Sequence, residues 1–339
     1  MRVLFWGTPE FAASALRALI GEGHDVVGVV TQPDRPQGRS RSRVVASPVK
    51  DVAVAEGIPV LQPEKPRGAD FIAQLKALDP EIAVVVAYGR LLPQEVIDLP
   101  PRGTLNIHGS LLPKLRGASP IEGAILAGLD ETGVSIMRMV LKLDAGPVLL
   151  REATPIGPDE TSGDLRYRLA EMGAEALIET LSMIETNTAH EEPQNDADAT
   201  FVKRITRDDT RVDWTTTAEQ VSRVIRAYDP KPGACTAKEG IEVKLFGARE
   251  VGVTRADTAD TADTADTFDA AAAAAAAGAT LTGAAAAHGT VLSINAEGMA
   301  VACGSGAVRV NAVHPSGRKR LSPRDWAAGR GVAVGDVLV

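Results

Sequence analysis

The sequence predicts an α/β protein in which a mostly parallel sheet forms an N-terminal domain and short strands form a smaller second domain. At 339 residues the chain exceeds the usual size of one domain, and its apolar content of 45% is ordinary for a globular protein. Apolar strand patterns alternate with helix patterns along the first half. Short alternating runs separated by glycine-rich turns follow from residue 235 onward.

The chain opens with a strand, a helix and a second strand. Arg2–Trp6 is a short apolar run, Thr8 suits a helix cap and Pro9 suits the first helical position. Asp25–Val30 then forms the second strand. Such a unit is parallel and right-handed, which predicts a Rossmann-like sheet. The fingerprint Gly-x-Gly-x-x-Gly is missing, so a nicotinamide dinucleotide site is only weakly supported.

A long connection over residues 31–43 carries four arginines against one aspartate. Loops of this length are usually either functional or unstructured. Because guanidinium groups bind phosphates through paired hydrogen bonds, the segment is either a solvated loop or a positive arm for a polyanion. The arginines are Arg35, Arg39, Arg41 and Arg43.

A central strand of the predicted sheet ends beside candidate ligand contacts. Glu81–Ala87 is almost continuously apolar, as expected for a strand buried on both faces, and Tyr88 and Gly89 follow it. Ligands of open parallel sheets bind at the carboxyl ends of the strands. Tyr88 and Gly89 are therefore candidate contacts, and Gly89 would let the backbone approach a flat ligand.

The next strand, Thr104–His108, carries the strongest candidate site. Its apolar and polar residues alternate, so Asn106 and His108 project from the same face. An amide donor beside an imidazole suits a site where negative charge develops on a carbonyl oxygen. The alternative interpretation is an edge strand whose polar residues face water.

A hairpin follows this strand after a short helix over residues 120–126. Thr132–Val140 and Val148–Pro155 are the expected strands, and Leu143–Gly146 is the turn between them. Asp144 lies in this turn, where aspartate is also a common turn former.

The domain boundaries follow from the second half of the chain. A long amphipathic helix over 162–184 closes the first domain, which we expect to span residues 1–188. Residues 189–207 are polar and mixed, as in a linker. The second domain is then 208–339.

Two further stretches of the second domain stand out in composition. Residues 253–288 contain four Ala-Asp-Thr repeats and eight consecutive alanines, which indicates a low-complexity insertion without a function. A second basic cluster, near the C-terminus, contains Arg318, Lys319 and Arg320. A formal net charge of −8 argues mildly against a polyanion partner, but the location of the basic residues matters more than the total.

The composition also argues against several classes of protein. No apolar run approaches the roughly 20 residues that cross a bilayer, and the apolar N-terminus is too short for a signal peptide. Cys235 and Cys303 stand far apart and outside any metal-binding spacing. We therefore expect a cytoplasmic protein with no membrane partner, no disulfide and no metal.

Residues 106–121 spell Asn-x-His-Gly-Ser-Leu-Leu-Pro-x-x-Arg-Gly-x-x-Pro-Ile. This string closely resembles the folate-dependent formyltransferases, and within them the methionyl-tRNA formyltransferases. The resemblance covers nearly the whole chain apart from 253–288 and implies an OB-like β-barrel in the C-terminal domain. It also implies transfer of a formyl group from 10-formyltetrahydrofolate to the α-amino group of methionyl initiator tRNA, for translation initiation. We expect the chain to be a monomer.

The resemblance assigns roles to the candidate residues. It implies that Asn106, His108 and Asp144 are catalytic, since the family has an essential carboxylate at the position of Asp144. It implies that the co-substrate folate binds beside Ser110, Leu111, Leu112, Pro113, Tyr88 and Gly89. It further implies that the tRNA contacts the two basic segments, through Arg35, Arg39, Arg41, Arg43, Arg318, Lys319 and Arg320.

This chain departs from the family pattern near the candidate carboxylate. Lys142 stands where glycine is usual, Ala145 replaces a common threonine, and Pro147 follows Gly146. Two alternatives stay open. The chain could be another 10-formyltetrahydrofolate-dependent formyltransferase or hydrolase, acting on glycinamide ribonucleotide or a nucleotide sugar, or it could be a non-catalytic RNA-binding protein on the same scaffold.

Overall fold

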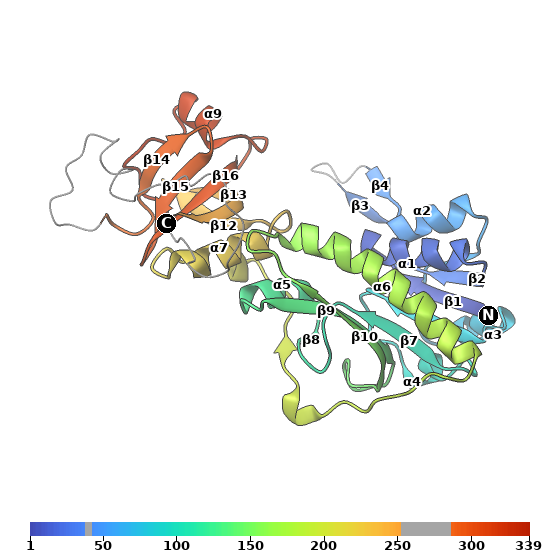
Figure 1. Cartoon of the computed structure of the whole chain (residues 1–339). Coiled ribbons are helices and arrows are strands. Elements are labelled where there is room, and N and C mark those ends of the chain that lie inside the picture. Colours follow the sequence, from blue (N-terminus) through green and yellow to red (C-terminus); the bar gives the residue numbers. More distant parts are fainter. Residues whose placement is uncertain (38–42, 252–285) are drawn as a thin grey trace. The chain divides into compact units, whose positions relative to one another are not determined.

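The computed structural model describes residues 1–37, 43–251 and 286–339, which divide into two compact units (Figure 1). Unit 1 comprises Met1–Ala124, Asp130–Ile156 and Asp164–Arg204; unit 2 comprises Ile125–Leu129, Gly157–Gly163 and Ile205–Val339. The insertion predicted at 253–288 lies outside the described residues, except for its last three positions.

Unit 1 is built on a seven-stranded sheet with the order β10-β9-β7-β6-β1-β2-β5. The five strands from β7 to β5 run parallel, and β9 and β10 pair antiparallel at one edge. The α/β class with a mostly parallel sheet is therefore confirmed. The strands are β1 Arg2–Gly7, β2 Asp25–Val30, β5 Val60–Leu61, β6 Ile82–Val86, β7 Thr104–His108, β9 Glu131–Arg138 and β10 Val148–Pro155.

Helices cover both faces of this sheet, as they do in α/β folds (Figure 1). Helix α6 packs on the face that carries Leu105 and Ile107, because a Cβ atom added at Gly173 would lie 2.8 Å from Ile107 Cγ2. Helices α3 and α4 share a core with Trp6 and Val85 on the opposite face. The helices are α1 Glu10–Gly21, α2 Pro48–Ala55, α3 Ala69–Ala77, α4 Gln94–Ile97, α5 Pro120–Leu126 and α6 Ser162–Glu185.

The start of α1 differs from the prediction. Thr8 does not cap the helix; Pro9 occupies the cap position, with no side-chain hydrogen bond. The Thr8 hydroxyl instead donates to the Tyr88 carbonyl over 3.3 Å. The Thr8 hydroxyl thus bonds the segment after a neighbouring strand instead of its own helix. Such a long-range partner cannot be predicted from local sequence.

The arginine-rich connection also contains structure that the sequence did not suggest. Strands β3 (Arg35–Gln37) and β4 (Arg43–Val45) pair antiparallel at its two ends. Asp34, at the base of β3, is held by Lys50 Nζ at 2.5 Å and by Gln62 Nε2 at 2.7 Å. The arginine-rich connection over residues 31–43, called the arm below, therefore starts from a fixed point beside the ends of β2 and β5.

Unit 2 contains a five-stranded antiparallel sheet with the order β12-β13-β16-β15-β14. Glu239 and Gly240 both have positive φ, which matches the two-residue hairpin between β12 and β13. A second domain of short strands is confirmed. Its elements are α7 Ala218–Ala227, β12 Ala234–Lys238, β13 Ile241–Val251, β14 Val291–Asn295, β15 Gly298–Ala302, β16 Ala307–Pro315 and α9 Pro323–Ala328.

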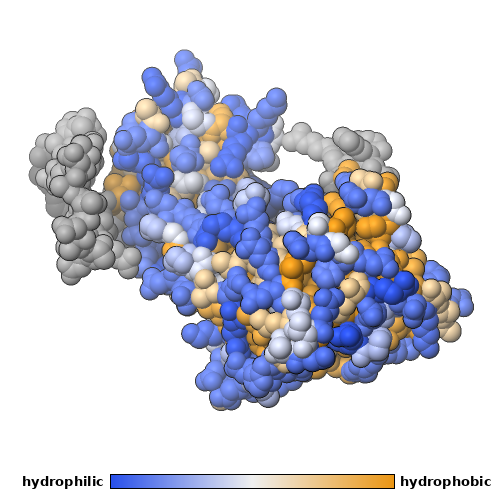
Figure 2. Space-filling model, turned by 45° about the vertical axis from the view of Figure 1, so that its right-hand side comes forward, coloured by the Kyte–Doolittle hydropathy of each residue, from blue (hydrophilic) through white to orange (hydrophobic). Residues whose placement is uncertain are grey.

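One face of the molecule is mainly polar. Figure 2 shows a face covered largely by hydrophilic side chains, with smaller hydrophobic areas between them. Within the described residues, no helix combines the length and apolar character needed to span a membrane.

Candidate active site

His108 and Asp144 meet on the face of the sheet opposite α6. His108 ends β7 and is buried, and its Nδ1 lies 3.9 Å from Oδ2 of Asp144. The carboxylate comes from the segment 139–147, which connects β9 to β10 and brings Asp144 close to His108 at the end of β7. The Asp144 side chain is 15% exposed, so the pair is largely shielded from water yet reachable.

The hydrogen bonds of His108 define which ring nitrogen is available. Nε2 lies 3.0 Å from the Leu115 carbonyl oxygen. Because a carbonyl only accepts, Nε2 carries the proton and donates it. Nδ1 is therefore the nitrogen that can gain or lose a proton, and it is the one that faces Asp144.

Asp144 is held in an unusual backbone conformation. Its φ is +46°, in the left-handed region, where residues other than glycine are uncommon. Its Oδ2 accepts a hydrogen bond of 2.8 Å from the Gly117 N–H, in the two-residue strand β8 (Arg116–Gly117). Gly117 itself has a φ of +118°, and an added Cβ would lie 2.1 Å from the Val202 carbonyl oxygen, so only glycine fits there.

Asn106 provides an unpaired amide beside this pair. It lies two residues before His108 on the same strand, so both side chains leave the sheet on one face. It is half-buried, and within the described part of the chain no hydrogen-bond partner reaches its side chain. An unpaired amide beside a buried imidazole can bind an oxygen that acquires negative charge.

Ser110–Pro113 forms a fixed wall rather than a free loop. Ser110 Oγ donates to the Lys114 carbonyl at 2.6 Å, and Leu112 N donates to Ser135 Oγ at 3.0 Å. The Leu112 side chain is buried with Met137 and Val148, whereas Leu111 and Pro113 are half-buried. Any ligand contact from this segment would come from Leu111 and Pro113.

Tyr88 and Gly89 differ in what they offer a ligand. The Tyr88 ring is buried edge-on against Trp6, with 5.1 Å between ring centroids. Burial raises the pKa of Tyr88 to about 12, and its hydroxyl has no hydrogen-bond partner among the described residues. Gly89 has a φ of +85°, and the space where a side chain would stand is open.

The predicted tRNA-contacting residues fall into three groups. Arg39 and Arg41 lie outside the described residues, and only the backbone of Arg43 is described. Arg35, Arg318 and Lys319 are exposed. Arg320 is already engaged, because its guanidinium lies 4.0 Å from the centre of the Phe246 ring and 3.8 Å from Asp229 Oδ1.

The sequence did not predict two residues that shape the site, Gln194 and the buried Arg116. Gln194 Nε2 donates to the carbonyls of Asp144 and Gly146, at 2.9 and 2.7 Å. Its Oε1 accepts from Arg116 Nε and Nη2, at 3.0 and 2.8 Å. Arg116 was visible in the motif, but no spacing rule links Gln194 to it.

Exposed apolar side chains precede Asp144 in its segment and also follow Gly89. Leu141 and Leu143, on the 139–147 segment, are 65% and 49% exposed, and Leu91, shortly after Gly89, is 83% exposed. Large apolar side chains exposed in a group often mark a binding surface. No group of three histidine, cysteine or acidic side chains that could hold a metal ion occurs in the ranges 1–37, 43–251 and 286–339.

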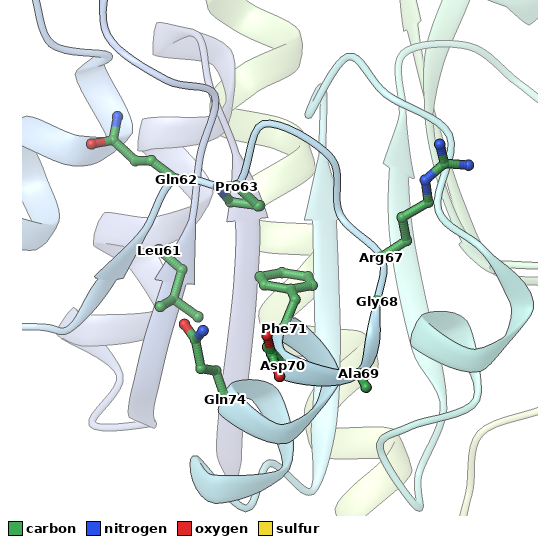
Figure 3. A pocket seen from close by; sticks show the side chains of 9 residues that line it. All are labelled: Leu61, Gln62, Pro63, Arg67, Gly68, Ala69, Asp70, Phe71 and Gln74. Carbon is green, nitrogen blue, oxygen red and sulfur yellow. The ribbon is translucent and has the colours of Figure 1, made fainter.

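A separate hollow of about 440 Å³ lies at the other edge of the sheet, at the end of β5 and the start of α3 (Figure 3). Its apolar lining includes Leu61 and Phe71, and its polar lining includes Gln62, Arg67 and Gln74. Figure 3 shows Gln62 and Arg67 pointing away from its centre. Gln62 is bound to Lys50 and Asp34, so its amide is not available to a ligand, whereas Arg67, Asp70 and Gln74 are exposed.

Known proteins resemble the chain over its whole length. A family model described as formyl transferase matches residues 1–181, and one described as formyl transferase, C-terminal domain, matches residues 204–331. A methionyl-tRNA formyltransferase of Chromobacterium violaceum is 43% identical, with 100% of this chain and 99% of the relative covered. One of Roseiflexus sp. is 41% identical, with 100% and 95% covered.

Solved structures share the fold. HypX from Aquifex aeolicus in complex with tetrahydrofolic acid has a TM-score of 0.63 at 20% identity over 96% of this chain. The chain spans about half the length of HypX, since 47% of that protein is covered. Methionyl-tRNA formyltransferase from Clostridium thermocellum has a TM-score of 0.52 at 14% identity, with 74% of this chain and 93% of that protein covered.

Proposed function

The chain belongs to the methionyl-tRNA formyltransferase family, and we propose that it transfers a formyl group from 10-formyltetrahydrofolate to the α-amino group of methionyl initiator tRNA, with Asn106, His108 and Asp144 as catalytic residues. The observation that carries this proposal is the 3.9 Å approach of Asp144 Oδ2 to His108 Nδ1, beside the unpaired amide of Asn106. The reaction serves translation initiation.

The chemistry requires positioning and proton transfer more than activation of the nucleophile. An α-amino group has a pKa near 7.7–8.0, so a good part of it is already neutral at pH 7 to 8. The amine nitrogen forms a bond to the formyl carbon, the bond from that carbon to the folate nitrogen breaks, and one proton passes from the amine to the folate nitrogen. Proximity and charge stabilisation therefore supply most of the rate.

Each of the three side chains has a distinct task. Asn106 donates its amide N–H to the formyl oxygen as negative charge develops there. His108 carries the transferred proton at Nδ1, because Nε2 is committed to the Leu115 carbonyl. Asp144 stabilises the positive charge of the ring while both of its nitrogens hold protons.

The folate co-substrate would lie between the segment 139–147 and the wall Ser110–Pro113. The flat apolar parts of a folate fit the exposed side chains of Leu141 and Leu143, and Gly89 leaves room for close backbone approach. The half-buried side chains of Leu111 and Pro113 would complete the contact. Tyr88 would contribute through its backbone, since its ring is in the core.

The tRNA would be bound largely through its phosphates. We assign catalysis to residues 1–188, tRNA contact to 208–339, and a connecting role to 189–207. In the first domain the arm would contribute Arg35, Arg39, Arg41 and Arg43, and in the second Arg318 and Lys319 are exposed for this purpose. Arg320 would contribute less, because Asp229 and Phe246 already hold it.

We place the protein in the cytoplasm as a monomer. Its two cysteines, Cys235 and Cys303, are both free and buried, which suits a reducing compartment. Burial raises the pKa of the Cys303 thiol to about 11, so it stays protonated and unreactive.

A substrate-comparison assay tests the proposed function. Formyl transfer from 10-formyltetrahydrofolate is measured with charged initiator tRNA, charged elongator tRNA and glycinamide ribonucleotide as acceptors. We expect turnover with initiator tRNA and at least tenfold less with the other two. Preferential formylation of glycinamide ribonucleotide would support a different formyltransferase, and tRNA binding without any turnover would support a non-catalytic RNA-binding protein.

A further inference from the structure

A single amide side chain ties together the two segments that form the acid–histidine contact. Gln194 lies in the stretch that follows α6, where an antiparallel bridge between Val148 and Glu192 fixes the backbone. Its amide nitrogen donates to two carbonyls of the 139–147 segment, and its oxygen accepts twice from Arg116. All the hydrogen-bonding groups of a glutamine amide are thus used for one purpose.

The bonds of Gln194 reach two segments that flank the Asp144 carboxylate: the backbone of the 139–147 segment and the guanidinium of Arg116. In one of them Gln194 Nε2 donates to the carbonyl of Asp144 itself, where a φ of +46° persists only if the surroundings impose it. The other side is the Arg116–Gly117 strand, whose Gly117 N–H donates to Asp144 Oδ2 at 2.8 Å. Gln194 therefore binds the backbone of the residue that carries the carboxylate and, through the Arg116 guanidinium, the strand whose Gly117 N–H orients it.

The buried guanidinium of Arg116 extends this arrangement to a second acid. Arg116 is 1% exposed and donates from Nη1 to Asp196 Oδ1 at 2.8 Å. Asp196 also pairs with Lys142, on the segment that carries Asp144. Hydrogen bonds from Lys142 and Arg116 lower the pKa of Asp196. Lys142 stands where the family pattern has glycine. Through Asp196 it adds a second connection between the 139–147 segment and Arg116, besides the one that Gln194 makes.

We propose that Gln194 is a positioning residue for formyl transfer, which holds the 139–147 segment against Arg116–Gly117 so that Asp144 faces His108 Nδ1. This inference rests on the proposed role of Asp144. Gln194 would touch neither substrate and would act only through the carboxylate. Displacing a catalytic group by about 1 Å can cost on the order of 10²-fold in rate, so the effect should appear in kcat.

The test is a double-mutant cycle with Asp144. Gln194→Met keeps the length of the side chain and removes all four hydrogen bonds, and we expect kcat to fall about 10- to 100-fold while the KM for tRNA changes less than about threefold. In the Asp144→Ala background, measured by single-turnover formyl transfer, the same substitution should lower the rate less than about twofold. Additive losses would overturn the proposal, because Gln194 would then act independently of the carboxylate.

Two further variants keep the outcome decisive. Gln194→Glu retains the acceptor for Arg116 but loses both donors to the 139–147 segment, so it should fold and still lose kcat; full activity in it would overturn the proposal. Gln74→Met, at an exposed glutamine of α3, is the matched control and should match the wild type. Near-wild-type turnover by Asp144→Ala would instead remove Asp144 from the mechanism. That outcome would contradict the proposed function, and it can be distinguished from additive losses in the cycle, which would contradict only the role of Gln194.

Discussion

The cluster around His108 and the hollow beside Leu61 are two very different regions of one sheet. The hollow encloses about 440 Å³, yet its Gln62 is bound to Lys50 and Asp34 (Figure 3). The cluster is mostly buried, yet it presents an unpaired amide and an imidazole nitrogen opposite a carboxylate. Available chemistry, not empty volume, therefore distinguishes the site.

The same comparison explains why charged groups occur in both regions with different consequences. The Asp34 carboxylate accepts bonds from both Lys50 and Gln62, so it serves to fix the base of the arm. Asp144 accepts one backbone bond and keeps its approach to His108 Nδ1, where a proton can be exchanged. A carboxylate that is fully paired stabilises structure, whereas one that is partly paired remains available for catalysis.

The largest expected effect comes from the cluster. Removing one donor to a developing oxyanion typically costs 10²- to 10³-fold in kcat. We therefore expect kcat to fall at least about 100-fold in each of the variants Asn106→Ala, His108→Ala and Asp144→Ala. Circular dichroism and thermal unfolding should show that the fold is retained. Asp70→Ala, at the hollow, is the matched control and should keep full activity. Near-wild-type turnover by His108→Ala would remove His108 from the mechanism.

The second effect concerns the arm whose base lies beside the hollow. Each phosphate contact adds about 0.7 to 0.9 to the slope of log affinity against log salt concentration. We expect the triple change of Arg39, Arg41 and Arg43 to glutamine to lower kcat/KM for tRNA about tenfold or more and to flatten its salt dependence. The KM for folate should not change.

A single arginine at the hollow supplies the control for the arm. Arg67→Gln removes one exposed positive charge from its rim and should leave the salt dependence of kcat/KM unchanged. If Arg67→Gln reduced tRNA use as strongly as the triple change, the hollow would belong to the tRNA surface and the contrast between the two regions would fail.

The sequence predicted most of the sheet because its strands carry local signals. Period-two alternation placed Asn106 and His108 on one face, and the continuous apolar run identified β6 as a buried strand. The approach of Asp144 to His108 followed only from the resemblance to a family, since no local pattern links positions 36 residues apart. Gln194 could not be predicted at all, because its partners lie 48 to 78 residues away and depend on tertiary structure.

A smaller effect tests the structural role of Asp34. Hydrogen bonds from Lys50 and Gln62 lower the pKa of Asp34 from its ordinary value of 3.8. The stability it contributes is therefore present above pH 3.8 and is lost as the pH falls through the lower folded-state pKa. We expect Asp34→Asn to reduce the free energy of unfolding at pH 6, and the difference from the wild type to shrink below about pH 4. Urea unfolding between pH 3 and pH 6 measures this, and a difference independent of pH would contradict it.

The smallest expected effect comes from filling the hollow itself. Ala69 lines it at the first residue of α3 and is exposed, so Ala69→Phe would occupy part of the space without burying a polar group. The hollow contributes no group to the reaction, and a surface substitution usually changes stability by less than about 0.5 kcal/mol. We therefore expect kcat and the KM values for folate and tRNA to stay within about twofold of the wild type. Steady-state kinetics with both substrates measures this. A rise in either KM alone would mean that the hollow binds that substrate. It would then be wrong that only the cluster around His108, and not the hollow, takes part in the reaction.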